Sequence, residues 1–139
     1  EVRNWKLLQN MLDTLQFSVE GLKSKYSGLV VQQGLPVNAP SGLMIALEYD
    51  KSKVDTQHEL AGYRRRPRVF FADIYGSTLK ERNYLCEEVK DLFENQNIKV
   101  LDESKQDTGI VMASEGVRIE VDHTQENKAR AKIYFYTLV

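Results

Sequence analysis

The sequence predicts an α/β (α+β) sandwich, in which a mostly antiparallel sheet of about four to five strands packs against two helices. Three observations support this prediction. An apolar stripe with helical spacing runs through residues 5–26, residues 68–75 form a strand that is apolar on both faces, and two segments near the end of the chain alternate apolar and charged residues. The length of 139 residues fits a single domain over residues 1–139.

The first segment, residues 1–27, is predicted to be a helix. Its apolar residues recur at steps of three and four, which is typical of one face of an amphipathic helix. These residues are Trp5, Leu8, Leu12, Leu15, Val19, Leu22 and Tyr26, and the stripe is widened by Leu7, Met11 and Phe17. The helix is therefore expected to meet apolar surface on more than one side. Residues 28–42 contain three glycines and two prolines, so they are predicted to be a connector in which 29–32 is a candidate short strand.

Two strands are predicted before the second helix. Residues 43–49 form the first, and the polar residues 50–62 form a surface loop. Residues 68–75 form the second, in which only Asp73 interrupts the apolar character of both faces. Strands of this kind are covered on both faces, so we expect helices or another subunit to cover both sides.

The second helix is predicted over residues 78–95. Thr78 and Glu81 have the spacing of a capping box, in which each side chain satisfies the other's backbone N–H. Cys86 lies near the apolar face of this helix, so a buried and unreactive core cysteine is favoured over a nucleophile. The residues that form this face are Leu85, Val89, Leu92 and Phe93.

The end of the chain is predicted to contain a short strand at 98–101, a polar loop at 102–109 and a hairpin. In the first hairpin strand Val117, Ile119 and Val121 alternate with Arg118, Glu120 and Asp122, and in the second Ala131, Ile133 and Phe135 alternate with Arg130, Lys132 and Tyr134. The outer face is mainly acidic in the first strand and basic in the second. Opposite charges across the strands are expected to set the register.

The composition excludes several classes of protein. A net charge of −1 gives no reason to expect nucleic acid or anionic membrane as a bulk partner. The apolar runs are far shorter than the ~20 residues of a membrane helix, and residues 1–12 lack the pattern of a signal peptide. Cys86 is the single cysteine, so no internal disulfide can form and the chain tolerates a reducing cytosol. We expect a soluble protein made inside the cell.

The residues give little reason to expect catalysis. Gly76 follows the best strand without a glycine-rich phosphate loop or a Lys-Ser pair. His58 and His123 lie in predicted loops, without acidic or cysteine companions at metal-ligand spacing. The acidic loop of Asp102, Glu103 and Asp107 is best explained as solvated surface charge. We therefore expect no enzyme, no cofactor and no metal site.

A block of arginines stands immediately before the best strand. Arg64, Arg65, Arg66 and Arg68 flank Pro67, which fixes the local backbone and keeps the preceding residue extended. The arginines could be a solvated strand entrance that keeps a sheet edge soluble. Alternatively, they form a basic patch aimed at acidic protein surface or at a DNA backbone.

Residues 64–102 carry an ordered set of features. The arginine-rich entrance leads to an apolar strand that ends in Asp-Ile-Tyr, a helix begins near Glu81 and Arg82, and a short strand ends at Asp102. This set resembles a segment of the small neck and tail-completion proteins of tailed bacteriophages, and the closing ENKARAKIYFYTLV is similar to the last strand of that family. The resemblance extends in order over 43–139. Where the family often has an aromatic turn with asparagine, this chain has DESKQD.

The resemblance implies a virion structural protein of the tail or neck, without catalytic activity and assembled in the host cytoplasm. Members include tail terminators, which form a ring on the last ring of the tail tube, stop its polymerisation and provide a docking surface for the head. It implies a hexameric ring with the tail tube protein on one side and a neck or connector protein on the other, non-specific contact with DNA in the channel, and no membrane. The candidate residues for an assembly interface or DNA channel are Arg64, Arg65, Arg66, Arg68, Trp5 and Phe71.

Other interpretations stay open at this point. The chain could be another neck connector or a head-completion protein. It could also be a non-viral α/β module whose arginines contact RNA or an acidic partner, although Tyr134 and Tyr136 lack the glycine-aromatic motif of common RNA-binding sheets. A small hydrolase is a third class, and the sequence lacks every constellation that it would need.

Overall fold

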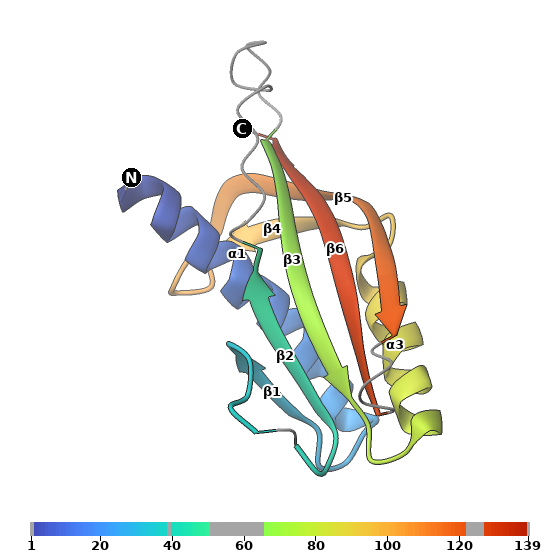
Figure 1. The fold of residues 1–139 in the computed structure, drawn as a ribbon. Helices are drawn as coiled ribbons and strands as arrows, with labels where there is room; N and C mark the ends of the chain where they lie inside the picture. Colours follow the sequence, from blue (N-terminus) through green and yellow to red (C-terminus); the bar gives the residue numbers. More distant parts are fainter. Residues whose placement is uncertain (1, 39, 51–65, 122–126, 139) are drawn as a thin grey trace.

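The computed structural model describes residues 2–38, 40–50, 66–121 and 127–138, and its fold is drawn in Figure 1. The chain contains two long helices, a short 3-10 helix and six strands in these residues. In chain order they are α1 (Val2–Glu20), η1 (Gly21–Ser24), β1 (Val30–Gln33), β2 (Met44–Tyr49), β3 (Arg66–Tyr75), α3 (Leu79–Phe93), β4 (Asn97–Leu101), β5 (Asp107–Val121) and β6 (Lys128–Leu138).

The strands form one mixed sheet in the order β1-β2-β3-β6-β5-β4. Among the described strand pairs only β1 and β2 run parallel, and the other four pairs are antiparallel. The predicted α+β fold is confirmed, but the sheet has six strands rather than four to five. The additional strand, β1, overlaps residues 29–32, the candidate short strand within the predicted connector.

Strand β5 is much longer than predicted. It begins at Asp107, inside the segment 102–109 that the sequence analysis assigned to a loop, and its first half pairs with β4. Thr108 and Gly109 are exposed there, so this part of the strand has no alternation of buried and exposed residues by which it could be recognised. The register shifts between Ser114 and Gly116, where the strand passes from β4 toward its pairing with β6 alone.

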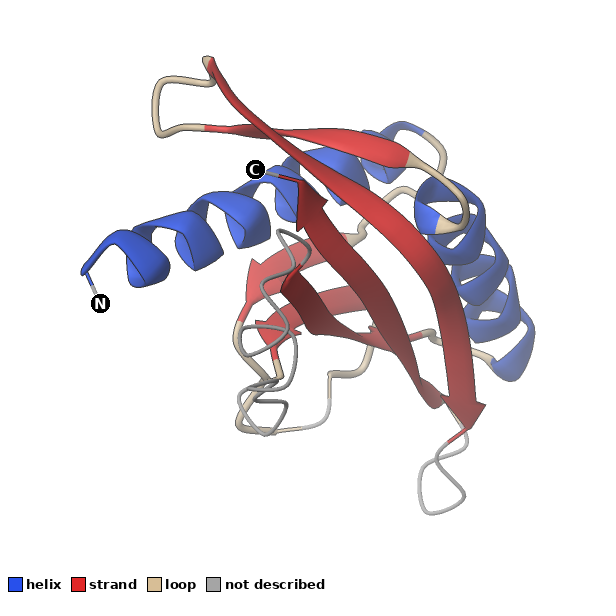
Figure 2. Ribbon diagram, turned by 90° about the horizontal axis from the view of Figure 1, so that it is seen from above, coloured by secondary structure: helices blue, strands red, loops and turns tan. Residues whose placement is uncertain are grey.

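Helices α1 and α3 pack on the same face of the sheet, as Figure 2 shows. Residues at helical spacing on each helix are fully buried, which places one continuous core between the helix layer and the sheet. Phe135 of β6 lies at the centre of this core, and its ring contacts Phe70 and Phe93 in edge-to-face arrangements at 6.2 Å. Helix residues of this core include Met11, Leu15, Val19, Leu85, Val89 and Phe93.

The start of α3 is fixed by its cap. The Thr78 side chain accepts a hydrogen bond from the backbone N–H of Glu81 at 3.2 Å, which is one of the two hydrogen bonds of the predicted capping box. Gly76 stands just before it, and a Cβ on this residue would lie 2.8 Å from the Thr78 carbonyl oxygen and closer still to the Arg82 backbone N. Only glycine therefore allows the strand β3 to turn so tightly into α3.

Candidate assembly interface

The face of the sheet opposite the helices carries the candidate interface. The described helices leave this face of residues 68–75 uncovered, so of the two expected covers, helices or another subunit, helices cover one face only. Because side chains alternate along a strand, Phe71, Asp73 and Tyr75 of β3 point to this face. They lie opposite Lys132, Arg130 and Lys128 of β6, respectively. We call these six residues the open-face cluster.

Asp73 is the electrostatic centre of the cluster. It is fully buried, and Arg130 binds it through two hydrogen bonds, from Nε–H to Oδ1 at 2.7 Å and from an Nη2–H to Oδ2 at 3.2 Å. The Nζ of Lys128 lies 3.8 Å from Oδ2. The hydrogen bonds to Asp73 raise the pKa of Arg130 above its ordinary value, although partial burial acts in the opposite direction. The carboxylate therefore holds two cations in fixed positions on the sheet.

The aromatic rings of β3 lie beneath these cations. The Arg130 guanidinium carbon is 4.5 Å from the centre of the Phe71 ring, and the Lys132 Nζ is 5.9 Å from it. In the same way the Lys128 Nζ lies 5.7 Å from the centre of the Tyr75 ring. These are cation–π contacts. The long side chains of β6 thus lie across β3, which explains how Tyr75 is almost fully buried on a face without helices.

Glu120 of β5 extends the charge network toward the edge of the cluster. Its Oε1 lies 3.3 Å from the Lys132 Nζ and 3.9 Å from the Arg118 Nε. The register places Glu120 opposite Arg130, as the charge alternation predicted, but it places Arg118 opposite the like-charged Lys132. Glu120 stands between these two cations and reduces their repulsion.

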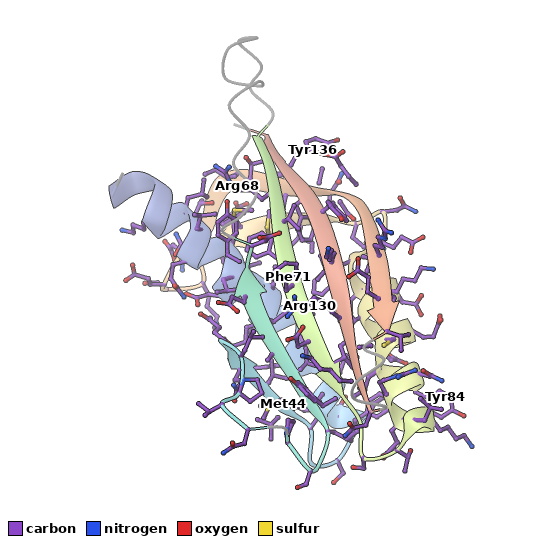
Figure 3. All side chains as sticks on the ribbon, viewed as in Figure 1. Met44, Arg68, Phe71, Tyr84, Arg130 and Tyr136 are labelled. Atoms are coloured by element: carbon purple, nitrogen blue, oxygen red, sulfur yellow. The ribbon has the colours of Figure 1, made fainter. Side chains whose placement is uncertain are left out.

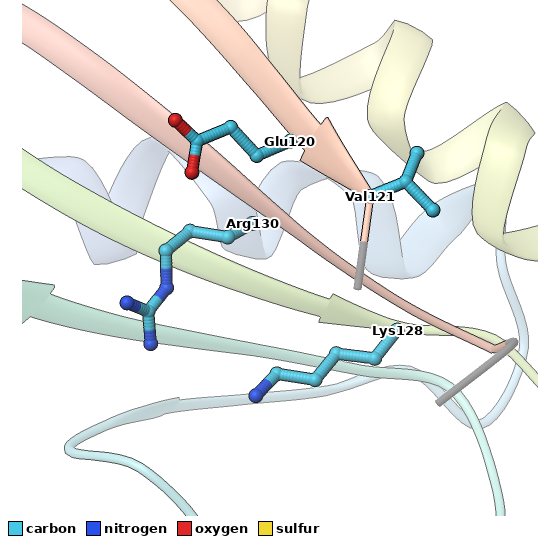
Figure 4. A pocket seen from close by; sticks show the side chains of 4 residues that line it. All are labelled: Glu120, Val121, Lys128 and Arg130. Carbon is cyan, nitrogen blue, oxygen red and sulfur yellow. The ribbon is translucent and has the colours of Figure 1, made fainter. Parts of the chain in front are cut away.

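A shallow pocket of about 260 Å³ opens beside this network. Figure 4 shows that its lining side chains are Glu120, Val121, Lys128 and Arg130. Its cations already contact carboxylates, so the pocket offers little attraction for a free anion. A polar protein surface that can contact both signs of charge matches this arrangement better than a phosphate does.

The structure places two of the candidate interface or channel residues on different faces of the sheet. Phe71 belongs to the open-face cluster, whereas Arg68 lies two residues before Phe70 and therefore points, like Phe70, to the side of the helices; it pairs with Phe135. Figure 3 shows Arg68 near the start of β3 and Phe71 beside Arg130 in the middle of the sheet. Arg66 begins β3, opposite Thr137.

Other candidate positions lie outside the described part of the chain. These are Arg64 and Arg65, the side chains of Arg66 and Trp5, and both histidines, His58 and His123.

The acidic and basic members of the open-face cluster were missed by the sequence analysis. Asp73 and Arg130 are 57 residues apart in the chain, so no local motif joins them. One signal was present: a single carboxylate inside an otherwise apolar strand needs a cationic partner. The alternating Lys128-Arg130-Lys132 pattern on the last strand was the natural place to look for that partner.

The described residues hold few groups that could bind a metal ion or act as a nucleophile. They contain no group of three or more His, Cys, Asp or Glu side chains that could hold a metal ion. Cys86 is buried, as predicted, and burial raises the pKa of its thiol to about 11. Across the described ranges, no helix has the length and apolar character needed to cross a membrane.

Solved structures share this fold, although no protein-family model and no curated protein matches the sequence. One solved chain, which bears only a sequence label as its name, has a TM-score of 0.58 at 12% identity and covers 94% of this chain and 93% of its own length. A chain in the virion of a native gene transfer agent (GTA) particle has a TM-score of 0.56 at 9% identity, covering 94% of this chain and 95% of its own. At such identities the similarity shows a common fold.

Proposed function

We propose that the chain is a virion structural protein, specifically a tail terminator that forms a ring at the head-proximal end of a phage-like tail. One observation carries the proposal: the fold of the whole chain, over 94% of its length, matches a chain of the virion of a gene transfer agent particle. The independent resemblance of residues 64–102 to neck and tail-completion proteins supports the same conclusion. In this role the protein needs no cofactor or metal and performs no catalysis.

The two-layer architecture suits a terminator. Helices α1 and α3 form one side of the subunit, and the sheet forms the other with the open-face cluster on it. A subunit of this kind is asymmetric, so a closed ring of it exposes two chemically different faces. One face can bind the last ring of the tail tube, while the other lacks the surface that the next tube ring would require. Polymerisation then stops, and a neck or connector protein docks instead.

The proposed ring is hexameric, and the number comes from the resemblance to terminators of hexameric tail tubes. The open-face cluster provides a pre-ordered polar surface for a protein partner in this ring. Because Asp73 fixes Arg130, and Phe71 supports it from below, little side-chain entropy remains to be lost when a partner binds. The arginine block, residues 64–68, is the proposed contact for DNA in the channel.

The test is deletion of the gene in the phage-like particle that encodes the chain. If the chain is a terminator, the deletion should give tails of excess and variable length. Supplying the wild-type gene in trans should restore tails of uniform length. Tails of normal length that fail to join heads would instead identify a neck connector or head-completion protein. Particles of normal form and yield would refute a virion role. An image reconstruction of the neck then locates the ring between tube and head.

The proposal competes with an RNA-binding or acidic-partner module. An exposed sheet with cations and aromatic rings is the general form of many single-strand-binding platforms. In this chain the Arg130 and Lys132 side chains already contact Asp73 and Glu120, which opposes that use. Salt-dependent binding of single-stranded RNA, lost on changing Arg130 and Lys132 together to Gln, would favour the module over the terminator.

A further inference from the structure

Exposed apolar side chains gather on two opposite sides of the subunit. Among the described residues, seven large hydrophobic side chains are exposed. Val30, Leu35 and Val37 lie on β1 and on the loop that follows it, and we call them the edge-loop patch. Leu79, Tyr84 and Val121 lie on α3 and at the end of β5. Figures 1 and 3 place β1 and the labelled Tyr84 on opposite sides of the molecule.

Strand β1 of the edge-loop patch carries neither a charged residue nor a proline, although Pro36 and Pro40 stand in the loop that follows it. Proteins normally keep an edge strand from pairing with other chains by placing charged residues or prolines on it. Here no Asp, Glu, Lys or Arg occurs from Leu29 to Leu47, which includes β1, the following loop and most of β2. Val37 projects from this loop with 99% of its surface exposed. Such a segment can be buried against a partner without removing any charge from water.

The opposite side carries a groove between α3 and β5. Strand β4 pairs with β5 only up to Ala113, so residues 117–121 of β5 make their described strand pairs with β6 alone. The groove beside this half of the strand has a volume of about 520 Å³. Its apolar lining comes from Tyr84, Cys86, Ile119, Val121 and Ala129, while Arg82, Glu87 and Lys90 of α3 give it both signs of charge.

We propose that these two surfaces bind one another in neighbouring copies of the chain. The edge-loop patch of one copy, led by Leu35 and Val37, lies in the α3–β5 groove of the next. A second copy is the favoured occupant because both apolar surfaces belong to the same chain, lie on opposite sides and do not overlap. A contact between two different patches repeats head to tail and closes into a ring when its rotation allows. This contact forms the subunit interface of the proposed ring, and its occurrence in a virion rests on the proposed function.

The first test uses one charged substitution on each surface. Val37→Asp changes the edge-loop patch and Val121→Asp changes the groove. Phe17→Asp is the control, because Phe17 is another exposed large hydrophobic side chain and lies on neither surface. We expect Val37→Asp and Val121→Asp each to abolish self-association in sedimentation experiments at high protein concentration. Phe17→Asp should behave as wild type. All three should stay folded at the temperature of the experiment, because Val37 is almost fully exposed and Phe17 and Val121 are about half exposed.

The decisive arm mixes the two variants. Each retains one intact surface, so an equal mixture of Val37→Asp and Val121→Asp should form dimers that cannot grow further. Larger oligomers from either variant alone, or no dimer in the mixture, would overturn the proposed contact.

For weak association, a short bismaleimide is applied to Val37→Cys/Val121→Cys in a Cys86→Ala background. We expect a ladder of covalent oligomers, whereas Phe17→Cys/Val121→Cys in the same background should give none. Absence of the ladder at millimolar protein would refute the contact.

The same variants separate this contact from the proposed function. Rings that form in solution through the two surfaces, while deletion of the gene leaves tails unchanged, would refute the terminator and retain the contact. Particles whose necks carry an intact ring of the Val37→Asp variant would refute the contact and retain the terminator.

Discussion

Replacing Asp73 with Ala should destabilise the protein more than any other single change on the open face. The substitution removes two charge-assisted hydrogen bonds, at 2.7 and 3.2 Å, and leaves Arg130 without its carboxylate. Breaking a buried ion pair by removing one partner costs about 3–5 kcal/mol. The Arg130 side chain is 33% exposed and can recover some hydration, so we expect a loss of about 2–4 kcal/mol in the free energy of unfolding.

The assay is urea unfolding followed by circular dichroism, with thermal unfolding beside it. For a chain of 139 residues, a loss of about 3 kcal/mol corresponds to a decrease of roughly 10 °C in melting temperature. Glu120→Ala is the matched control, because Glu120 is a carboxylate on the same face that contacts Lys132 at 3.3 Å but is 41% exposed. An exposed pair of this kind contributes less than about 1 kcal/mol.

Two results would refute this reasoning. The first is a Asp73→Ala variant whose stability lies within about 0.5 kcal/mol of the Glu120→Ala variant. The second comes from the double variant Asp73→Ala/Arg130→Met. If the cost arises from an uncompensated guanidinium, removing that group as well should recover part of the lost stability. A double variant that loses the sum of the two single effects would show that the residues act independently.

Three further predictions concern other parts of the chain. Arg65→Glu/Arg66→Glu should leave the melting temperature nearly unchanged, as substitutions of solvated side chains usually do, but should lower the yield of tailed particles. Normal assembly of this variant would show that both arginines are solvated surface residues without a role in assembly. Gly76→Ala should cost about 1–3 kcal/mol or more in urea unfolding, because its Cβ meets the backbone at the start of α3. Gly42→Ala should be nearly neutral, because in the described part of the chain no atom beyond its two chain neighbours lies within 4 Å of the added Cβ. Burial raises the pKa of the Cys86 thiol from 9.0 to about 11. The contribution of the neutral thiol to the free energy of unfolding is therefore complete below pH 9 and is lost as the pH rises toward 11. The Cys86→Ala variant should not show this loss. Rapid labelling of this thiol in the native protein at pH 8 would contradict its burial.

The elements that were predicted well are those whose sequence shows a clear period. Helix α1 and helix α3 each carry an apolar stripe at steps of three and four, and the core they form with the sheet follows from it. The last two strands were recognised by alternation from Val117 onward. The start of β5 was missed because its residues are exposed on the sheet edge, where pairing with β4 and not burial determines the conformation.

The candidate site was predicted less well than the fold. Phe71 was chosen for its apolar character, and the structure shows it as the support for Arg130 and Lys132. Arg68 and Phe71, both candidates, point to opposite faces because an odd separation of three along a strand places two side chains on opposite faces. The contacts between β3 and β6 depend on the register of these two strands. That register is set by the packing of the whole sheet, not by a local sequence motif.

The ion pairs on the open face bear on two roles that the sequence analysis considered for basic residues, contact with an acidic protein surface and contact with DNA. A channel wall for DNA needs cations that can release the phosphate counterions, and such contacts weaken as salt increases. Arg130 and Lys132 are held by Asp73 and Glu120 within the subunit, so phosphate contacts would have to displace carboxylates that are already in place. We therefore infer that the open face serves protein contacts and that DNA contact depends on the arginine block 64–68. On this basis, changing Arg65 and Arg66 should alter the salt dependence of DNA passage or retention in the particle. Changing Lys132 to Gln should instead weaken the binding of a protein partner and leave that salt dependence as it was.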